Sequence, residues 1–107
     1  MLSKKERVTT RHFTEVLTTG KTVFHPLFSV RVLQNKDKIF KLAAVVPKAV
    51  AKKAVKRNEL RRVVYNFALQ NKAFFKKDCS YIVFLKKGTE KMSHKELFSE
   101  MNRFFKV

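Results

Sequence analysis

An apolar stripe on one predicted helix constrains the fold of this chain more than any other feature. Between Lys53 and Asn71, apolar residues recur at positions i, i+3, i+4, i+7 and i+8, and these are Leu60, Val63, Val64, Phe67 and Ala68. This spacing places them on one side of an α-helix, and the helix has to bury that side. The rest of the chain must therefore supply a layer that packs against it.

Extended segments are expected to form that layer. From Thr22 to Leu33, apolar residues alternate with a mixed set that includes Ser29 and Arg31, so one face of the strand is apolar and the other is not. Pro26 predicts an edge or a bulge near the start. After a turn over 35–38, Ile39–Val46 is expected to complete an antiparallel hairpin and to lie centrally, because it is mostly apolar. Ser80–Leu85 reads as a short buried strand.

Two further helices complete the pattern. Thr10–Thr19 carries Phe13, Val16 and Leu17 on one face, with Thr9 or Thr10 as its cap and Gly20 at its end. The last helix begins at Ser93, where Glu96 completes a capping-box pattern. The order helix, strands, helix, strand, helix predicts an α+β fold, a small α-β sandwich. A length of 107 residues fits a single domain, 1–107.

Charge indicates the partner. The chain has 25 Lys and Arg against 8 Asp and Glu, a net charge of +17, and a polyanion would relieve the self-repulsion. No segment approaches the roughly 20 apolar residues of a membrane span, and MLSKKERVTT has no apolar signal segment. The single Cys79 fits a reducing compartment. We expect a cytoplasmic protein that binds nucleic acid, while a basic helix on an anionic membrane surface remains a weaker alternative.

The positive charge is concentrated between residues 48 and 62. One acid, Glu59, accompanies seven basic residues there, for a net charge of +6: Lys48, Lys52, Lys53, Lys56, Arg57, Arg61 and Arg62. At 100° per residue, Arg57, Asn58 and Arg61 share an arc beside the apolar stripe, and Arg62 lies just beyond it. A solvated helix face usually mixes signs, so a face of nearly one sign predicts an anion-binding surface. Lys53 and Lys56 align with the stripe, so they must precede the regular helix or lie past the core.

The same segment carries a family resemblance. The run from Ala54 to Arg62, AVKRNELRR, resembles the signature of the protein subunit of bacterial ribonuclease P, which centres on Arg-Asn-Arg. Val45-Val46-Pro47-Lys48 before it is similar to the family's approach to that helix. The opening Phe13-x-x-Val16-Leu17-x-x-Gly20 and the run from Asp78 to Gly88 also match in order and spacing. The resemblance therefore covers nearly the whole chain.

The resemblance implies a fold, a partner and an activity. The family fold is a small α-β sandwich with a left-handed βαβ crossover, an exception to the usual handedness. Its members bind a large catalytic RNA, and the complex removes the 5′ leader of precursor tRNA. Catalysis belongs to the RNA and its associated magnesium, so the protein is expected to carry no cofactor and no catalytic residue.

The resemblance also implies two binding surfaces. The catalytic RNA would contact Arg57, Asn58, Arg61 and Arg62, with Lys48, Lys52, Lys53 and Lys56 extending that surface. The family's leader-binding cleft would include Phe13, Leu17, Ser29 and Arg31.

Two residues depart from the family pattern. Glu59 replaces the second Arg of the signature and is expected to pair with an Arg or to face water. Tyr65 stands where many members carry a basic residue. It is expected either to stack on a nucleobase of the RNA or to be an ordinary amphipathic side chain on the helix surface.

Other chemistry is not supported by the sequence. The three His residues lack neighbours at ligand spacing, so no protein-bound metal is expected, and the chain has no glycine-rich phosphate loop for a small-molecule substrate. Cys79 is expected to be a buried, inert thiol, and the aromatic residues other than Phe13 are expected to be core. The alternative function is a structural ribosomal or general RNA-binding protein with no role in cleavage.

Overall fold

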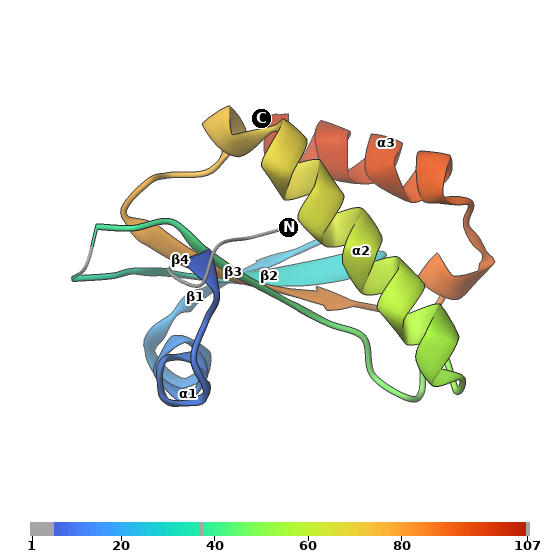
Figure 1. Ribbon diagram of the computed structural model, residues 1–107, viewed down its shortest axis with the longest axis horizontal. Helices are drawn as coiled ribbons and strands as arrows, with labels where there is room; N and C mark the ends of the chain where they lie inside the picture. Colours follow the sequence, from blue (N-terminus) through green and yellow to red (C-terminus); the bar gives the residue numbers. More distant parts are fainter. Residues whose placement is uncertain (1–5, 37, 107) are drawn as a thin grey trace.

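The structure is a computed structural model that describes residues 6–36 and 38–106, so residues 1–5 of the segment searched for a signal, and Asp37 of the predicted turn, lie outside it. Three helices and four strands follow one another along the chain (Figure 1): α1 (Thr10–Thr19), β1 (Lys21–Phe24), β2 (Phe28–Gln34), β3 (Lys41–Val45), α2 (Ala54–Gln70), β4 (Cys79–Leu85) and α3 (His94–Lys106). Short 3-10 helices, Lys72–Phe74 and Thr89–Lys91, lie before and after β4. Among these helices, none is long and apolar enough to cross a membrane.

The four strands form one mixed sheet in the order β1-β2-β4-β3. β2 pairs antiparallel with β1 and with β4, while β3 pairs parallel with β4. The predicted hairpin between the second and third strands is therefore wrong, because β4 lies between them. β3 is also an outer strand and not a central one. The burial of the two strands gives the physical reason, since six of the seven residues of β4 are buried but those of β3 alternate.

The single extended segment predicted from Thr22 to Leu33 is two strands joined by a tight turn. The backbone N–H of His25 donates to the carbonyl of Phe28, 2.9 Å away, and so closes the turn. Pro26 lies between these residues, where a missing N–H removes nothing from the strand ladder. Pro26 therefore marks the hairpin turn at the end of β1, which is an edge strand of the sheet, so the edge is confirmed and the bulge is wrong.

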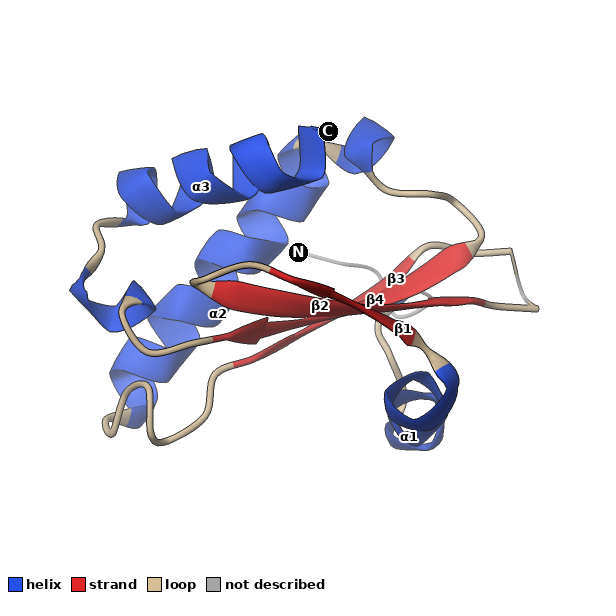
Figure 2. Ribbon diagram, turned by 180° about the vertical axis from the view of Figure 1, so that it is seen from behind, coloured by secondary structure: helices blue, strands red, loops and turns tan. Residues whose placement is uncertain are grey.

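The helices lie on opposite faces of the sheet. α2 and α3 cover one face, and α1 covers the other (Figure 2). The apolar stripe of α2 is buried as predicted, and it packs with the inward residues of β2, β3 and β4 in the main core. Most phenylalanines join this core, where Phe67 contacts the rings of Phe74, Phe75, Phe98 and Phe105. The prediction of an α+β sandwich with an aromatic core is confirmed.

The parallel neighbours β3 and β4 are joined through α2, which makes a βαβ unit as the resemblance implies. The left-handed sense of this connection stays a prediction.

Hydrogen bonds at the helix ends agree with the predicted caps. Thr9 accepts from the backbone N–H of His12 at 3.2 Å. Ser93 and Glu96 form a reciprocal capping box. The backbone N–H of Ser93 donates to the Glu96 carboxylate at 3.0 Å, and the backbone N–H of Glu96 donates to the Ser93 hydroxyl oxygen at 3.1 Å. Gly20 has a φ of −73°, so it serves a close approach and not a left-handed turn. A Cβ atom there would lie 2.5 Å from the carbonyl oxygen of Val16.

Candidate nucleic-acid interface

The basic loop before α2 leads into a protruding helix N-terminus. Lys53 is the N-cap and has extended backbone angles. It therefore precedes the regular helix, which is one of the two positions predicted for it. Lys48, Lys52 and Lys53 are all exposed, and Val55 in the first turn is 69% exposed. No acidic residue lies in that first turn and no side chain caps it. The helix end therefore presents its N–H groups and nearby ammonium groups without local neutralisation, which favours phosphate.

Both views show where this helix end lies relative to the sheet. α2 crosses the sheet obliquely, and its N-terminal end extends past the sheet to the side that carries α1 (Figures 1 and 2). The basic loop and α1 therefore lie on the same side of the sheet plane.

Arg57 holds the basic loop in place. Its Nη1 atom donates to the carbonyl oxygens of Ala51 at 3.0 Å and Lys52 at 2.7 Å. The side chain is only partly exposed, because it lies between the helix and the loop. A guanidinium group has five N–H donors, so other N–H groups remain for a phosphate. Arg57 thus combines a structural contact with a possible RNA contact.

The remaining residues of the predicted arc lie nearer to solvent. Arg61 donates to the side-chain oxygen of Asn58 one turn earlier, which aligns the two polar groups. Asn58 and Arg62 are exposed, and Arg61 is partly exposed. The structure therefore brings Arg57, Asn58, Arg61 and Arg62 together along one flank of α2, beside its buried stripe.

Glu59 lies on the other flank of the helix, away from the arginines. Its carboxylate is 3.9 Å from the ammonium of Lys56 and 3.9 Å from Nε2 of His94 at the start of α3. Of the two expectations, pairing with a neighbouring Arg is replaced by these two contacts, while the side chain, 42% exposed, does face water. Glu59 therefore tempers the charge of Lys56 and leaves the arginine arc unopposed.

Tyr65 has a packing role. Its hydroxyl oxygen accepts a hydrogen bond from the backbone N–H of Ala44 at 3.2 Å, on the outer strand β3. The ring is partly buried against the core. A parallel bridge between Arg7 and Leu42 covers more of the same strand edge. Tyr65 thus protects an otherwise exposed edge, and the packing alternative describes it better than base stacking.

The four predicted cleft residues share the face of the sheet that carries α1. Arg31 Nη1 donates to the carbonyl oxygen of Leu17 at 2.5 Å, which ties β2 to the end of the helix. The ring of Phe13 packs edge-on against Phe84 of β4, with centroids 6.4 Å apart. Ser29 is the direct cross-strand neighbour of Phe84. The alternation predicted for β2 therefore places Ser29 and Arg31 correctly.

Two residues on this face were missed by the sequence reasoning. Phe24 of β1 lies opposite Ser29 and is 75% exposed. The ammonium of Lys86 stands 5.5 Å from the centre of its ring. The prediction that the aromatic residues are core fails at Phe24. The signal was its position at the end of the strand, just before the turn that contains Pro26.

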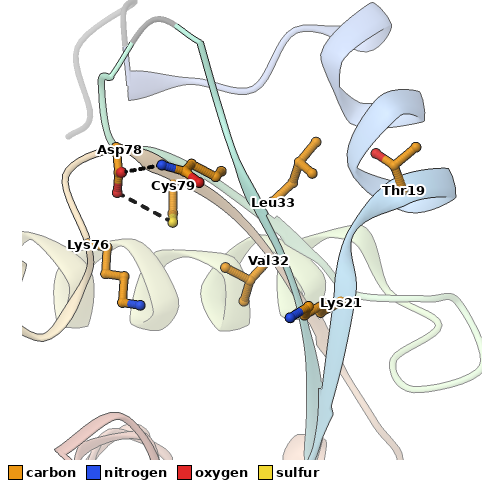
Figure 3. A pocket seen from close by; sticks show the side chains of 8 residues that line it. Thr19, Lys21, Val32, Leu33, Lys76, Asp78 and Cys79 are labelled. Carbon is orange, nitrogen blue, oxygen red and sulfur yellow. Dashed lines mark hydrogen bonds between the residues drawn. The ribbon is translucent and has the colours of Figure 1, made fainter.

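A pocket of about 400 Å³ lies near the end of β2, next to Cys79 (Figure 3). The Cys79 thiol donates to a carboxylate oxygen of Asp78 at 3.6 Å, and the other oxygen accepts from Gln34 at 2.8 Å. Burial raises the pKa of the Cys79 thiol, and the negative charge of Asp78 raises it further. The prediction of a buried cysteine is confirmed. A raised pKa keeps the thiol protonated at neutral pH, which agrees with the expectation that it is unreactive.

Comparison with known proteins gives a family for this chain. The family model Ribonuclease P matches residues 2–107. The ribonuclease P protein component of Syntrophus aciditrophicus (strain SB) is 29% identical over 101 residues, which are 94% of this chain and 84% of that protein.

Two solved structures share the fold. The RNase P protein of Staphylococcus aureus has a TM-score of 0.87 at 22% identity. The match covers 96% of this chain and 94% of the S. aureus chain. The RNase P protein of Thermotoga maritima has a TM-score of 0.82 at 24% identity. The match covers 94% of this chain and 96% of the T. maritima chain. Because the family model matches nearly the whole of this chain, the chain belongs to the bacterial ribonuclease P protein family.

Proposed function

We propose that this chain is the protein subunit of a ribonuclease P ribonucleoprotein, which binds the catalytic RNA through its basic segment and the 5′ leader of precursor tRNA through the face that carries α1. One observation carries the RNA-binding part of the proposal. The four residues Arg57, Asn58, Arg61 and Arg62 share one flank of α2, while the acid within the segment, Glu59, lies on the other flank and faces α3. A surface of one sign beside a protruding helix N-terminus suits a phosphate backbone.

The protein side chains bind and position, while the hydrolysis itself belongs to the catalytic RNA and its magnesium ions. Leader and catalytic RNA are both polyanions, so bringing them together is opposed by their charges. A protein with a net charge of +17 between them reduces that repulsion. We therefore expect the protein to strengthen leader binding and to lower the magnesium concentration that cleavage requires. Partners of the complex are the catalytic RNA and precursor tRNA, with no membrane and no small-molecule substrate, and its place is the cytoplasm.

The two surfaces lie on the same side of the sheet plane, so one RNA assembly can contact both. The N-terminal end of α2 and helix α1 are on the same side of the sheet plane (Figures 1 and 2). Arg57 orients the loop that leads from β3 to α2, so the lysines of that loop keep a defined place beside the arginines of the basic segment.

Leader removal at low magnesium tests the proposal. A bacterial ribonuclease P RNA is incubated with precursor tRNA at a magnesium concentration that supports little cleavage alone, with and without this protein. We expect the protein to stimulate release of the 5′ leader. The variant Arg61→Ala/Arg62→Ala should require more protein for the same stimulation. Lys95→Ala, which removes one exposed lysine of α3, is the control for general loss of charge and should behave as the parent.

The outcome also separates the alternative function. A structural ribosomal or general RNA-binding protein would bind the RNA in a salt-sensitive manner without raising the rate of leader release. Binding without stimulation would therefore contradict the proposed function.

A further inference from the structure

Phe24 is the most exposed large apolar side chain among the described residues, at 75%. It lies at the end of the outer strand β1, just before the turn that contains Pro26. One side of its ring faces the ammonium of Lys86, 5.5 Å from the ring centre. Lys86 is itself held there, because its Nζ donates to the carbonyl oxygen of His25 at 2.9 Å. A fixed cation beside an open aromatic ring is a suitable place for a base and its phosphate.

The strand register shows what lies next to Phe24. Phe24 pairs with Ser29, Ser29 pairs with Phe84, and Phe84 pairs with Val45. Directly paired residues point to the same face of a sheet, so Phe24, Ser29, Phe84 and Val45 form one row across all four strands. We call this set the cross-sheet row. With strands about 4.8 Å apart, three spacings give the row a length of about 14 Å.

Helix α1 leaves one end of this row open. The helix is fixed to the sheet farther along, where His12 Nε2 lies 2.6 Å from Ser80 Oγ and where Leu17 accepts from Arg31. Phe13 reaches the row through its edge contact with Phe84. Ser29, Phe84 and Val45 are partly buried, and burial decreases sharply at Phe24. At the other end, the chain continues from Val45 into the loop that carries Lys48.

The cross-sheet row therefore has a positively charged group near each end and mainly apolar side chains between them. The basic loop follows Val45 at one end, and Lys86 stands beside Phe24 at the other. A single RNA strand matches this pattern, because unpaired bases stack on aromatic rings while phosphates pair with ammonium groups.

We propose that Phe24 and Lys86 form a nucleotide subsite at the β1 edge, where one unpaired base of the precursor-tRNA leader stacks on Phe24 and its phosphate meets Lys86. This subsite rests on the proposed function, since it extends the leader-binding surface from Ser29 to the outer strand. A leader that reaches Phe24 gains the stacking contact, and a shorter leader does not.

Phe24→Ala is the direct test, and Val23→Ala is its matched control. Val23 belongs to the same strand and is 47% exposed, but it points to the opposite face, where it lines a groove with Phe104 and Phe105. Each variant is assembled with the catalytic RNA, and its affinity for precursor tRNAs is measured as the leader is shortened one nucleotide at a time. Because the ring is exposed, the melting temperature of the Phe24→Ala protein should match that of the parent.

We expect Phe24→Ala to weaken binding of the long leader by about tenfold or more, as the loss of one base-stacking contact predicts, and to have no effect once the leader is too short to reach β1. Val23→Ala should have no effect at any length, and Phe24→Trp should retain the affinity for the long leader. If the parent depends on leader length but Phe24→Ala behaves as the parent, the subsite is wrong and the leader-binding surface stands. If the parent shows no dependence on leader length, the proposed leader function and the subsite both fail.

Discussion

The guanidinium group of Arg57 donates a hydrogen bond to the carbonyl oxygen of Lys52, and the two atoms lie 2.7 Å apart. This contact joins the first turn of α2 to the loop before it, in which Lys48, Lys52 and Lys53 are found. An arginine of the proposed RNA-binding surface is therefore also part of the scaffold that shapes that surface.

Arg57→Ala should lower both stability and RNA affinity. Loss of the two bonds to the loop carbonyls is expected to reduce the free energy of unfolding by about 1–3 kcal/mol. Urea denaturation measures the first effect, and titration with the catalytic RNA measures the second. Arg57→Lys keeps the charge without the planar fork, so it should recover part of the affinity but little of the stability. A stability equal to that of the parent would contradict the role assigned to the contact.

Arg62→Ala should affect binding alone. The side chain is exposed and lies beyond the loop contacts, so its removal should change the free energy of unfolding by less than about 0.5 kcal/mol. Affinity for the catalytic RNA should fall, and the slope of log affinity against log salt should decrease by about one unit if Arg62 meets one phosphate. A lower affinity with an unchanged slope would show that Arg62 does not pair with a phosphate.

Glu59→Gln should strengthen RNA binding. The substitution frees Lys56 from its partner at 3.9 Å and raises the net charge of the basic segment. Stability should change by less than about 1 kcal/mol, because exposed ion pairs contribute little. Binding titrations at two salt concentrations should show the gain mainly at the lower one. Weaker binding by the variant would indicate that Glu59 itself contacts the RNA.

Tyr65→Phe should reduce stability without changing RNA affinity. The variant keeps the ring but leaves the backbone N–H of Ala44 without its acceptor, at an expected cost of about 0.5–1.5 kcal/mol. Thermal denaturation monitored by circular dichroism gives the stability. A variant as stable as the parent but with weaker RNA binding would favour an RNA contact for the Tyr65 hydroxyl.

Cys79 should react slowly with alkylating reagents in the folded protein. Burial, with the nearby carboxylate of Asp78, raises the pKa of its thiol, so the reactive thiolate should become abundant only at higher pH than for an ordinary cysteine. Asp78→Asn removes the negative charge, which should lower the pKa and shift the rate profile to lower pH. Protein unfolded in guanidinium is the control and should react at the rate of a free thiol.

Local features of this fold could be predicted from the sequence. The helix predicted from Lys53 to Asn71 is observed from Ala54 to Gln70, because its apolar period and its ends are properties of neighbouring residues. The capping box at Ser93 and the outward side chains of Ser29 and Arg31 follow from equally local rules.

Strand pairing could not be predicted in the same way. The choice of partner for β2 depends on β4, which is more than forty residues away, and a short turn after β2 made a hairpin with β3 the simpler expectation. The nearly continuous burial of Cys79–Leu85 is what marks the central strand.

The functional site, too, could be predicted only where it depends on residues that are neighbours in the sequence. The helical period predicted the arc of Arg57, Asn58 and Arg61, but not the loop carbonyls that hold Arg57. The partner of Glu59 on α3 and the exposure of Phe24 both depend on elements distant in sequence. Such contacts become visible only when the strands and helices are assembled.

The salt dependence of catalytic RNA binding tests the central claim most directly. Affinity of the parent and of Arg61→Ala/Arg62→Ala for a bacterial ribonuclease P RNA is measured over a range of salt concentrations. If the basic segment holds the RNA backbone, the slope for the variant is smaller by about two units, while Lys95→Ala keeps the parent slope. Equal slopes for the parent and the double variant would contradict the assignment of this surface to the RNA.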